Sequence, residues 1–173
     1  MSENQDKIKK RSERILKLFN AIKGKNIADF PGPIPPFSKW LNGKIIDVNH
    51  GEIEMEFKIR PEWANPTGLL HGGMQGALID DTIGMTTATL GYEGFLISID
   101  SQLNYLGKAK VGDIIRTKTK LIREGRNIVN IYCKIVDING NLIATGNSNL
   151  LKTQYTPDYI KEIDRIANYN HGE

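Results

Sequence analysis

The segment from Gly72 to about Leu90 places the strongest restriction on how this chain can fold. It is rich in Met, Ala, Leu and Ile, and its charged residues are Asp80 and Asp81. Its length and composition predict a helix, but apolar residues occur on several sides of that helix, so it lacks the polar face of a surface helix. We therefore expect other elements to enclose it.

The segments on both sides of this helix alternate between apolar and polar residues with a period of two, which predicts β-strands. Asn49-His50-Gly51 predicts a hairpin turn, with His50 exposed and without a role. Asn139-Gly140 is the strongest short hairpin signal in the chain. Consecutive hairpins build an antiparallel sheet, and we expect this sheet to wrap around the apolar helix. The predicted strands are a hairpin at 43–60, one strand at 95–106, and strands at 114–123, 128–138 and 142–153.

Two more helices are expected outside this unit. Residues 5–23 place apolar side chains at helical spacing between Lys and Arg, which predicts an amphipathic helix packed on the main body. A membrane-surface helix would use the same pattern, but the acids in the segment weigh against it. Thr156-Pro157-Asp158 predicts the start of a C-terminal helix. The expected organisation is an N-terminal extension at 1–42, with a stiff Pro-rich loop at 31–36 and aromatic anchors at 37–41, a main domain at 43–153 and a C-terminal helix and tail at 154–173.

Composition narrows the class of protein. The 173 residues are 39% hydrophobic and 25% charged, which indicates neither disorder nor a membrane span. A net charge of +3 is compatible with anionic ligands, and we expect neither a nucleic-acid nor a membrane partner. The single cysteine, Cys133, excludes an intrachain disulfide and fits a reducing compartment, so a cytoplasmic protein is expected.

The start of the apolar helix carries the clearest chemical signal. His71-Gly72-Gly73 leads directly into it, and the first N–H groups of a helix have no internal partner. These donors and the positive end of the helix dipole favour a negatively charged or polarised oxygen. About two turns further along, a carboxylate pair lies among apolar residues, where a charge is costly without a partner or a role. The combination points to chemistry at a carbonyl group.

The same residues carry a resemblance to a known family. The sequence resembles the acyl-CoA thioesterases of the phenylacetyl-CoA and 4-hydroxybenzoyl-CoA thioesterase superfamily, which have the hotdog fold, an α+β fold with a curved antiparallel sheet around a long central helix. The resemblance extends over residues 43–153. Its motif consists of Asn65, His71-Gly72-Gly73 and Asp80, followed by Ser98 and Asp100 and by the turn at 107–113.

The resemblance implies a role for each of these positions. Gly72 N–H and the Asn65 side chain would polarise the thioester carbonyl, with His71 shaping the turn. Asp80 would act as general base or nucleophile, and Ser98 would orient the water or the carboxylate. Burial among apolar neighbours should raise the pKa of this helix carboxylate toward the range useful for a base. Neighbouring helical residues point about 100° apart, so Asp80 and Asp81 cannot both face the site. Because the helix is apolar on several sides, periodicity alone leaves Asp81 as an alternative to Asp80 for this role.

The resemblance also implies a substrate and an assembly. We expect hydrolysis of a small, medium or aromatic acyl-CoA, with coenzyme A as part of the substrate and with no separate cofactor or metal. Self-association as a dimer or a dimer of dimers is expected. Two other functions remain open on this fold: a non-catalytic acyl-CoA-binding regulator, and a dehydratase or hydratase. Residues expected to contact coenzyme A are Gly73, Lys108, Lys110, Arg123 and Arg126.

Overall fold

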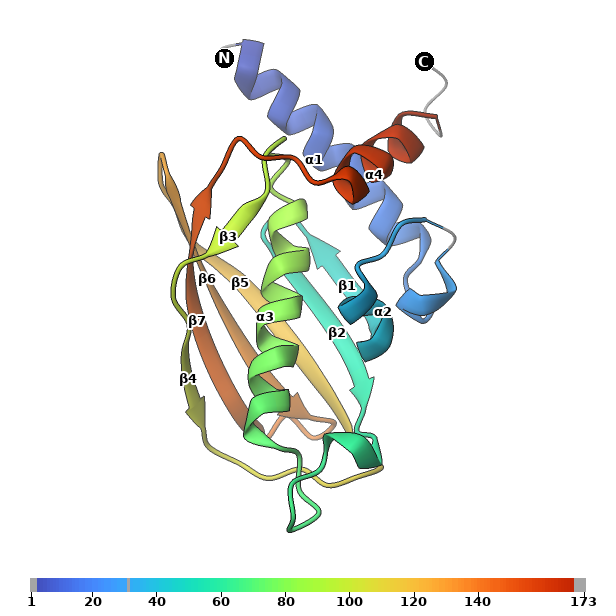
Figure 1. Ribbon diagram of the computed structural model, residues 1–173, viewed down its shortest axis with the longest axis vertical. Helices are drawn as coiled ribbons and strands as arrows, with labels where there is room; N and C mark the ends of the chain where they lie inside the picture. Colours follow the sequence, from blue (N-terminus) through green and yellow to red (C-terminus); the bar gives the residue numbers. More distant parts are fainter. Residues whose placement is uncertain (1–2, 31, 170–173) are drawn as a thin grey trace.

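The computed structural model describes residues 3–30 and 32–169, with the side chains of 167–169 excepted. A long helix lies across one face of an antiparallel sheet, and the terminal helices pack at one end of the pair (Figure 1). The elements are α1 (Glu3–Ala21), α2 (Pro36–Leu41), β1 (Lys44–Asn49), β2 (Glu52–Lys58), α3 (Gly72–Ala88), β3 (Leu96–Ser98), β4 (Gln102–Tyr105), β5 (Ile114–Glu124), β6 (Ile128–Asp137), β7 (Leu142–Lys152) and α4 (Asp158–Tyr169), with short 3-10 turns at Ile27–Asp29 and Pro61–Trp63.

The sheet has the hotdog arrangement that the sequence predicts. Its strand order is β1-β2-β5-β6-β7-β3, and β4 also pairs with β7. The apolar helix α3 lies on the inner face, where Leu78, Ile79 and Ile83 are fully buried. Gly146 in β7 allows this close approach, because a Cβ atom there would lie 2.6 Å from Ile79 Cγ2. The enclosed helix and the hairpin-linked strands are therefore confirmed.

Hydroxyl groups join the helix to the sheet within this apolar core. The hydroxyl oxygens of Thr82 in α3 and Thr117 in β5 are 2.9 Å apart. One turn along the helix and two residues along the strand, those of Thr86 and Thr119 are 2.7 Å apart. All four threonines are buried, and each polar group has a partner, as buried polar groups require.

One strand prediction was wrong. The segment predicted as a single strand over 95–106 forms two strands, β3 and β4, separated by residues 99–101. The interruption is fixed by Asp100, whose carboxylate accepts hydrogen bonds from the backbone N–H and the side-chain amide of Asn149 at 2.9 and 2.8 Å. These bonds lower the pKa of Asp100 and hold the chain beside β7 at the break between the two strands.

The N-terminal extension is fastened to the body by polar contacts. The buried Arg11 of α1 donates to both carboxylate oxygens of Asp164 in α4, at 2.8 and 3.1 Å, and also to the backbone oxygen of Tyr92. Ser12 donates to Thr89 O at 2.6 Å and lies 3.1 Å from His50 Nδ1. His50 is exposed as predicted, but the prediction that it has no role was wrong, because it holds α1 to the β1–β2 turn.

Aromatic residues fasten the short helix α2, as the sequence predicts. Arg60 lies between the rings of Trp40 in α2 and Trp63, with its guanidinium carbon 4.7 and 4.6 Å from the two ring centroids. The Pro-rich loop before α2 is a connection, as expected, although Pro31 lies outside the described residues.

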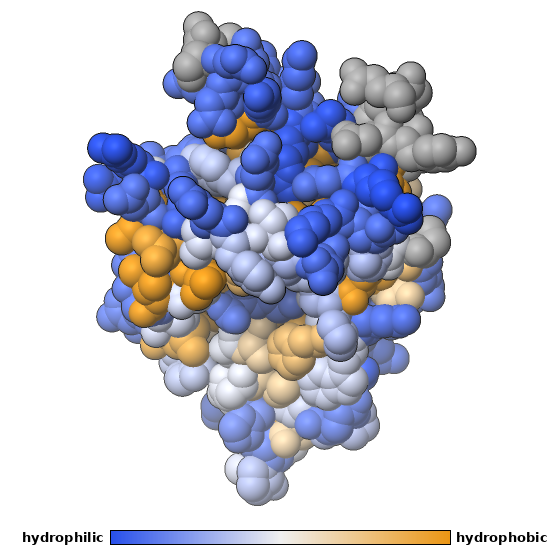
Figure 2. Space-filling view, turned by 45° about the horizontal axis from the view of Figure 1, so that its top comes forward, coloured by the Kyte–Doolittle hydropathy of each residue, from blue (hydrophilic) through white to orange (hydrophobic). Residues whose placement is uncertain are grey.

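One edge of the sheet is open and partly apolar. Strands β3 and β4 form this edge, and each pairs on one side with β7. Ile97, Leu151 and Ile128 are cross-strand neighbours on the outer face and are each about 40% exposed. Figure 2 shows apolar side chains at several places on the surface, with the largest group at the left of the view. Within the described residues, no helix is long and apolar enough to cross a membrane.

Candidate active site

The loop before α3 is organised by the side chain of Asn65. Its Oδ1 atom accepts hydrogen bonds from the backbone N–H and the hydroxyl of Thr67, at 2.9 and 2.7 Å, and from Leu69 N–H at 3.2 Å. Its Nδ2 group donates to none of the described residues. The oxygen of Asn65 therefore holds the loop, and its N–H donors remain available to a ligand.

His71 caps the helix by binding the N–H group of Gly73, and it leaves the N–H group of Gly72 unbound. Its Nδ1 atom accepts the N–H of Gly73 at 2.9 Å, so the proton of a neutral ring is carried by Nε2. Among the described residues, no group accepts the N–H of Gly72. This donor lies at the positive end of a 17-residue helix and is free for an oxygen atom of a ligand. Gly73, expected to contact coenzyme A, has its N–H occupied by His71.

The candidate residues of α3 lie in one line beside the open sheet edge. Gly72, Gly76 and Asp80 are four residues apart and share a face of the helix. A Cβ atom on Gly72 would lie 3.3 Å from the Tyr105 ring, and one on Gly76 would lie 2.9 Å from Leu103. Asp80 Oδ1 accepts a hydrogen bond from Ser98 Oγ at 3.2 Å.

The exposed ring of Tyr105 thus lies beside Gly72, and the sequence motif gives no sign of this neighbour. Its alternation with Leu103 could have placed it on the inner face of the sheet. Different parts of α3 face different edge strands. The helix end that carries Gly72 faces β4, and the helix centre that carries Asp80 faces β3.

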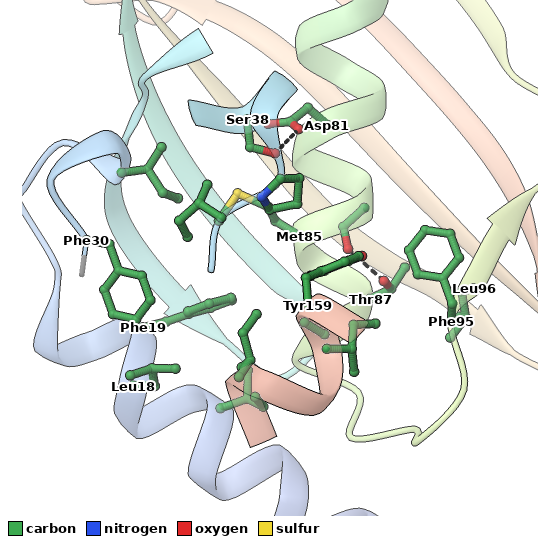
Figure 3. A pocket seen from close by; sticks show the side chains of 18 of the residues that line it. Leu18, Phe19, Phe30, Ser38, Asp81, Met85, Thr87, Phe95, Leu96 and Tyr159 are labelled. Carbon is green, nitrogen blue, oxygen red and sulfur yellow. Dashed lines mark hydrogen bonds between the residues drawn. The ribbon is translucent and has the colours of Figure 1, made fainter. Parts of the chain in front are cut away.

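The two adjacent carboxylates of α3 occupy different environments. Asp80 is exposed and is held by Ser98, whereas Asp81 is mostly covered and accepts a 2.5 Å hydrogen bond from Ser38 of α2 (Figure 3). Burial raises the pKa of Asp81 to about 6, while the bond from Ser38 opposes the rise. The raised pKa of Asp81 arises because the N-terminal extension covers that side of the helix.

The four predicted phosphate-binding cations form two separate pairs. Lys108 and Lys110 lie beside the loop that precedes α3, where Leu70 N–H donates to Ala109 O at 2.8 Å. Arg123 near the end of β5 and Arg126 in the β5–β6 turn lie at the opposite end of the sheet (Figure 1). No described acidic side chain pairs with any of the four. A helix of 17 residues is about 25 Å long, so one protomer does not bring both pairs to one phosphate group.

Within the part of the chain that the structure describes, no three His, Cys, Asp or Glu side chains are grouped so that they could hold a metal ion. The candidate site therefore consists of amide donors, a carboxylate and hydroxyl groups. Its donors suit a developing oxyanion, and its carboxylate suits the transfer of a proton.

Comparison with known proteins places the chain among thioesterases. The Thioesterase superfamily model matches residues 67–144. Human acyl-coenzyme A thioesterase 13 is 28% identical over 109 residues, which is 60% of this chain and 76% of that protein.

Two solved structures show the same fold. One, from Ralstonia eutropha JMP134 and described as a phenylacetic acid degradation-related protein, is 30% identical with a TM-score of 0.65, and the match covers 72% of this chain and 96% of that one. A hypothetical thioesterase with coenzyme A from Streptococcus pneumoniae TIGR4 is 22% identical with a TM-score of 0.62, covering 67% and 92% of the two chains.

The chain belongs to the thioesterase superfamily and has its hotdog fold, so by class it is a thioester hydrolase.

Proposed function

We propose that this protein hydrolyses acyl-CoA thioesters to a free acid and coenzyme A. One observation carries the proposal. The unpaired N–H of Gly72, at the start of α3, lies on the same face of the helix as Asp80, which is held by Ser98. The site thus offers a donor for a carbonyl oxygen and an accessible carboxylate for water. The relatives that are acyl-CoA thioesterases or bind coenzyme A support this choice of thioester.

In the proposed reaction, the carbonyl oxygen of the thioester accepts hydrogen bonds from Gly72 N–H and Asn65 Nδ2. Asp80 takes a proton from a water molecule as its oxygen attacks the carbonyl carbon, and the tetrahedral oxyanion is stabilised by the two donors. The carbon–sulfur bond then breaks, and the proton on Asp80 passes to the leaving thiolate. Ser98 keeps the carboxylate in place, and no step requires a metal. Direct attack by Asp80 would use the same geometry.

We further propose that each site is shared between two protomers. Gly72 and Asp80 are eight residues apart on a continuous helix, so their backbones lie about 12 Å apart. A base must lie about 3 Å from its water, and this gap is too wide for one thioester. Antiparallel packing of two α3 helices about a two-fold axis would place Asp80 of one protomer opposite Gly72 of the other. The open edge of β3 and β4, with exposed Ile99 and Tyr105, offers a surface for such a dimer.

The proposed function is tested by release of free thiol from acyl-CoA substrates. The purified protein should hydrolyse at least some members of a panel of linear and aromatic acyl-CoAs, and Asp80→Asn should lower kcat by about 100-fold or more. The variant should bind the substrate with an affinity similar to that of the wild type. Tight acyl-CoA binding without thiol release by the wild type would instead identify a non-catalytic binding protein and refute the proposal.

A further inference from the structure

An apolar cavity lies where the two terminal extensions cover α3. It has a volume of about 280 Å³, and its walls come from α1, the loop before α2, α3 and α4. In Figure 3 the lining extends from Phe95 and Leu96 on one side to Leu18 and Phe30 on the other. Aliphatic and aromatic side chains dominate these walls. Ligand pockets typically combine such an apolar lining with a few polar groups.

The cavity reaches the proposed catalytic carboxylate. Asp80 is part of its lining, together with Asp81, Gly84 and Ser38. Asp80 also accepts the hydrogen bond from Ser98 at the sheet edge, so the carboxylate belongs both to the proposed reaction site and to the cavity. An acyl group whose carbonyl lies near Asp80 can therefore extend directly into the apolar space.

The walls of the cavity lie largely outside the part shared with relatives. The superfamily match begins at residue 67 and ends at residue 144, so it does not include α1, α2 and α4. The match to the Ralstonia eutropha structure covers 96% of that chain but 72% of this one. The cavity is thus a property of this chain's additional segments, and it would give this protein a substrate preference of its own.

We propose that this cavity binds the acyl group of the substrate and selects unbranched aliphatic chains of medium length. The inference rests on the proposed thioesterase function and specifies its substrate. A water-sized group takes about 30 Å³, so 280 Å³ holds roughly nine such groups, which corresponds to an acyl chain of about eight to ten carbons. Because the lining runs from Phe95 and Leu96 across α3 to Leu18 and Phe30, it fits an extended chain better than a compact ring.

The substrate profile of the wild type is the first part of the test. We expect kcat/KM to rise from acetyl-CoA to decanoyl-CoA, by up to about fourfold for each methylene group that becomes buried, and to stop rising at longer chains. Phenylacetyl-CoA should be hydrolysed less efficiently than decanoyl-CoA. A profile that is flat from acetyl-CoA to decanoyl-CoA, or one that peaks at the aromatic substrate, would overturn the proposal.

Gly84 offers a variant in the cavity wall. It is an exposed residue of the lining, and a Cβ atom there would meet no heavy atom within 4 Å, so a larger side chain can narrow the cavity without displacing the backbone. Gly84→Leu should lower the ratio of kcat/KM for decanoyl-CoA to that for butanoyl-CoA by at least tenfold. The matched variant Gly84→Ala should change this ratio less than threefold. An unchanged ratio in Gly84→Leu would show that the acyl chain binds elsewhere.

A second variant acts on the opposite wall and leaves α3 intact. Ile34 lies in the loop before α2, and Ile34→Ala should enlarge the cavity and move the optimum to longer chains. This variant decides the question if Gly84→Leu fails to fold or to form the wild-type assembly by light scattering. An optimum that stays in place in a folded Ile34→Ala protein would count against the cavity.

Binding of decanoic acid, measured by calorimetry, separates the inference from the function on which it rests. Binding to the wild type that is at least tenfold weaker in Gly84→Leu would support the cavity even if no thioester were hydrolysed, in which case the proposed function alone would fail. Hydrolysis with a flat chain-length profile and no binding of decanoic acid would leave the function intact and refute the cavity as the acyl site.

Discussion

Asp81 allows a quantitative test of how the terminal extension affects stability. Its pKa is raised by burial to about 6, against 3.8 for an ordinary aspartate. Between these pH values the folded protein binds a proton that the unfolded chain has released. The free energy of unfolding therefore falls as the pH rises through this interval. At 1.36 kcal/mol per pKa unit, the loss amounts to about 3 kcal/mol.

Replacing Asp81 by Asn should remove this loss. The amide stays neutral at every pH, and its oxygen can still accept the hydrogen bond from Ser38. The free energy of unfolding of the variant should match that of the wild type near pH 4 and exceed it by up to about 3 kcal/mol at pH 8. For a domain of this size the gain corresponds to roughly 6–12 °C in Tm.

Urea unfolding at a series of pH values and at one protein concentration measures this difference directly. Ser38→Ala provides the opposite perturbation, since it removes a donor that lowers the pKa of Asp81. It should destabilise the protein more at pH 8 than at pH 4. A difference between Asp81→Asn and the wild type that is the same at pH 4 and pH 8 would refute the assignment of a raised pKa to the buried carboxylate.

Further predictions concern the reaction and the assembly. Asp80→Asn should lower kcat by about 100-fold or more, whereas Asp81→Asn should keep most of the rate; the reverse order would transfer the role of base to Asp81. Asn65→Ala and Asp80→Ala homodimers should both be poor enzymes, and dimers mixed from the two should recover toward half of the wild-type activity, because one site stays intact; inactive mixed dimers would exclude a shared site. Replacing Arg123 and Arg126 by Ala should raise KM for acyl-CoA but not for a truncated acyl-pantetheine thioester, and equal effects on both substrates would exclude phosphate contacts. Chelation with EDTA should leave the hydrolysis rate unchanged, and a loss that zinc restores would contradict a metal-free reaction.

Much of the fold could be predicted from local patterns. The apolar helix, the hairpins and the amphipathic terminal helices each follow from spacing within one segment. The break between β3 and β4 could not, because it depends on Asp100 bonding to Asn149, a residue on another strand. The pattern of Ile97, Ile99 and Leu103 continues through the break and gives no sign of it.

The candidate site shows the same division between local and long-range information. The positions of Gly72 at the helix start and of Asp80 two turns later follow from the sequence of this one segment. The different burial of Asp80 and Asp81 depends on Ser38, more than 40 residues away, and a helix that is apolar on several sides does not indicate which carboxylate is covered. For the same reason the cavity was not predicted: the walls that face α3 come largely from terminal segments to which the family resemblance assigns no role.

The threonine pairs between α3 and the sheet have a consequence for the precision of the site. Apolar packing has no direction, so an apolar helix on an apolar sheet could slide along its axis at modest cost. The pairs Thr82–Thr117 and Thr86–Thr119 oppose such a shift, because moving the helix by one turn would separate or exchange donor and acceptor in a buried environment. They lie on the helix face turned toward β5, away from the face that carries Asp80, yet they oppose an axial shift of Asp80 relative to Ser98.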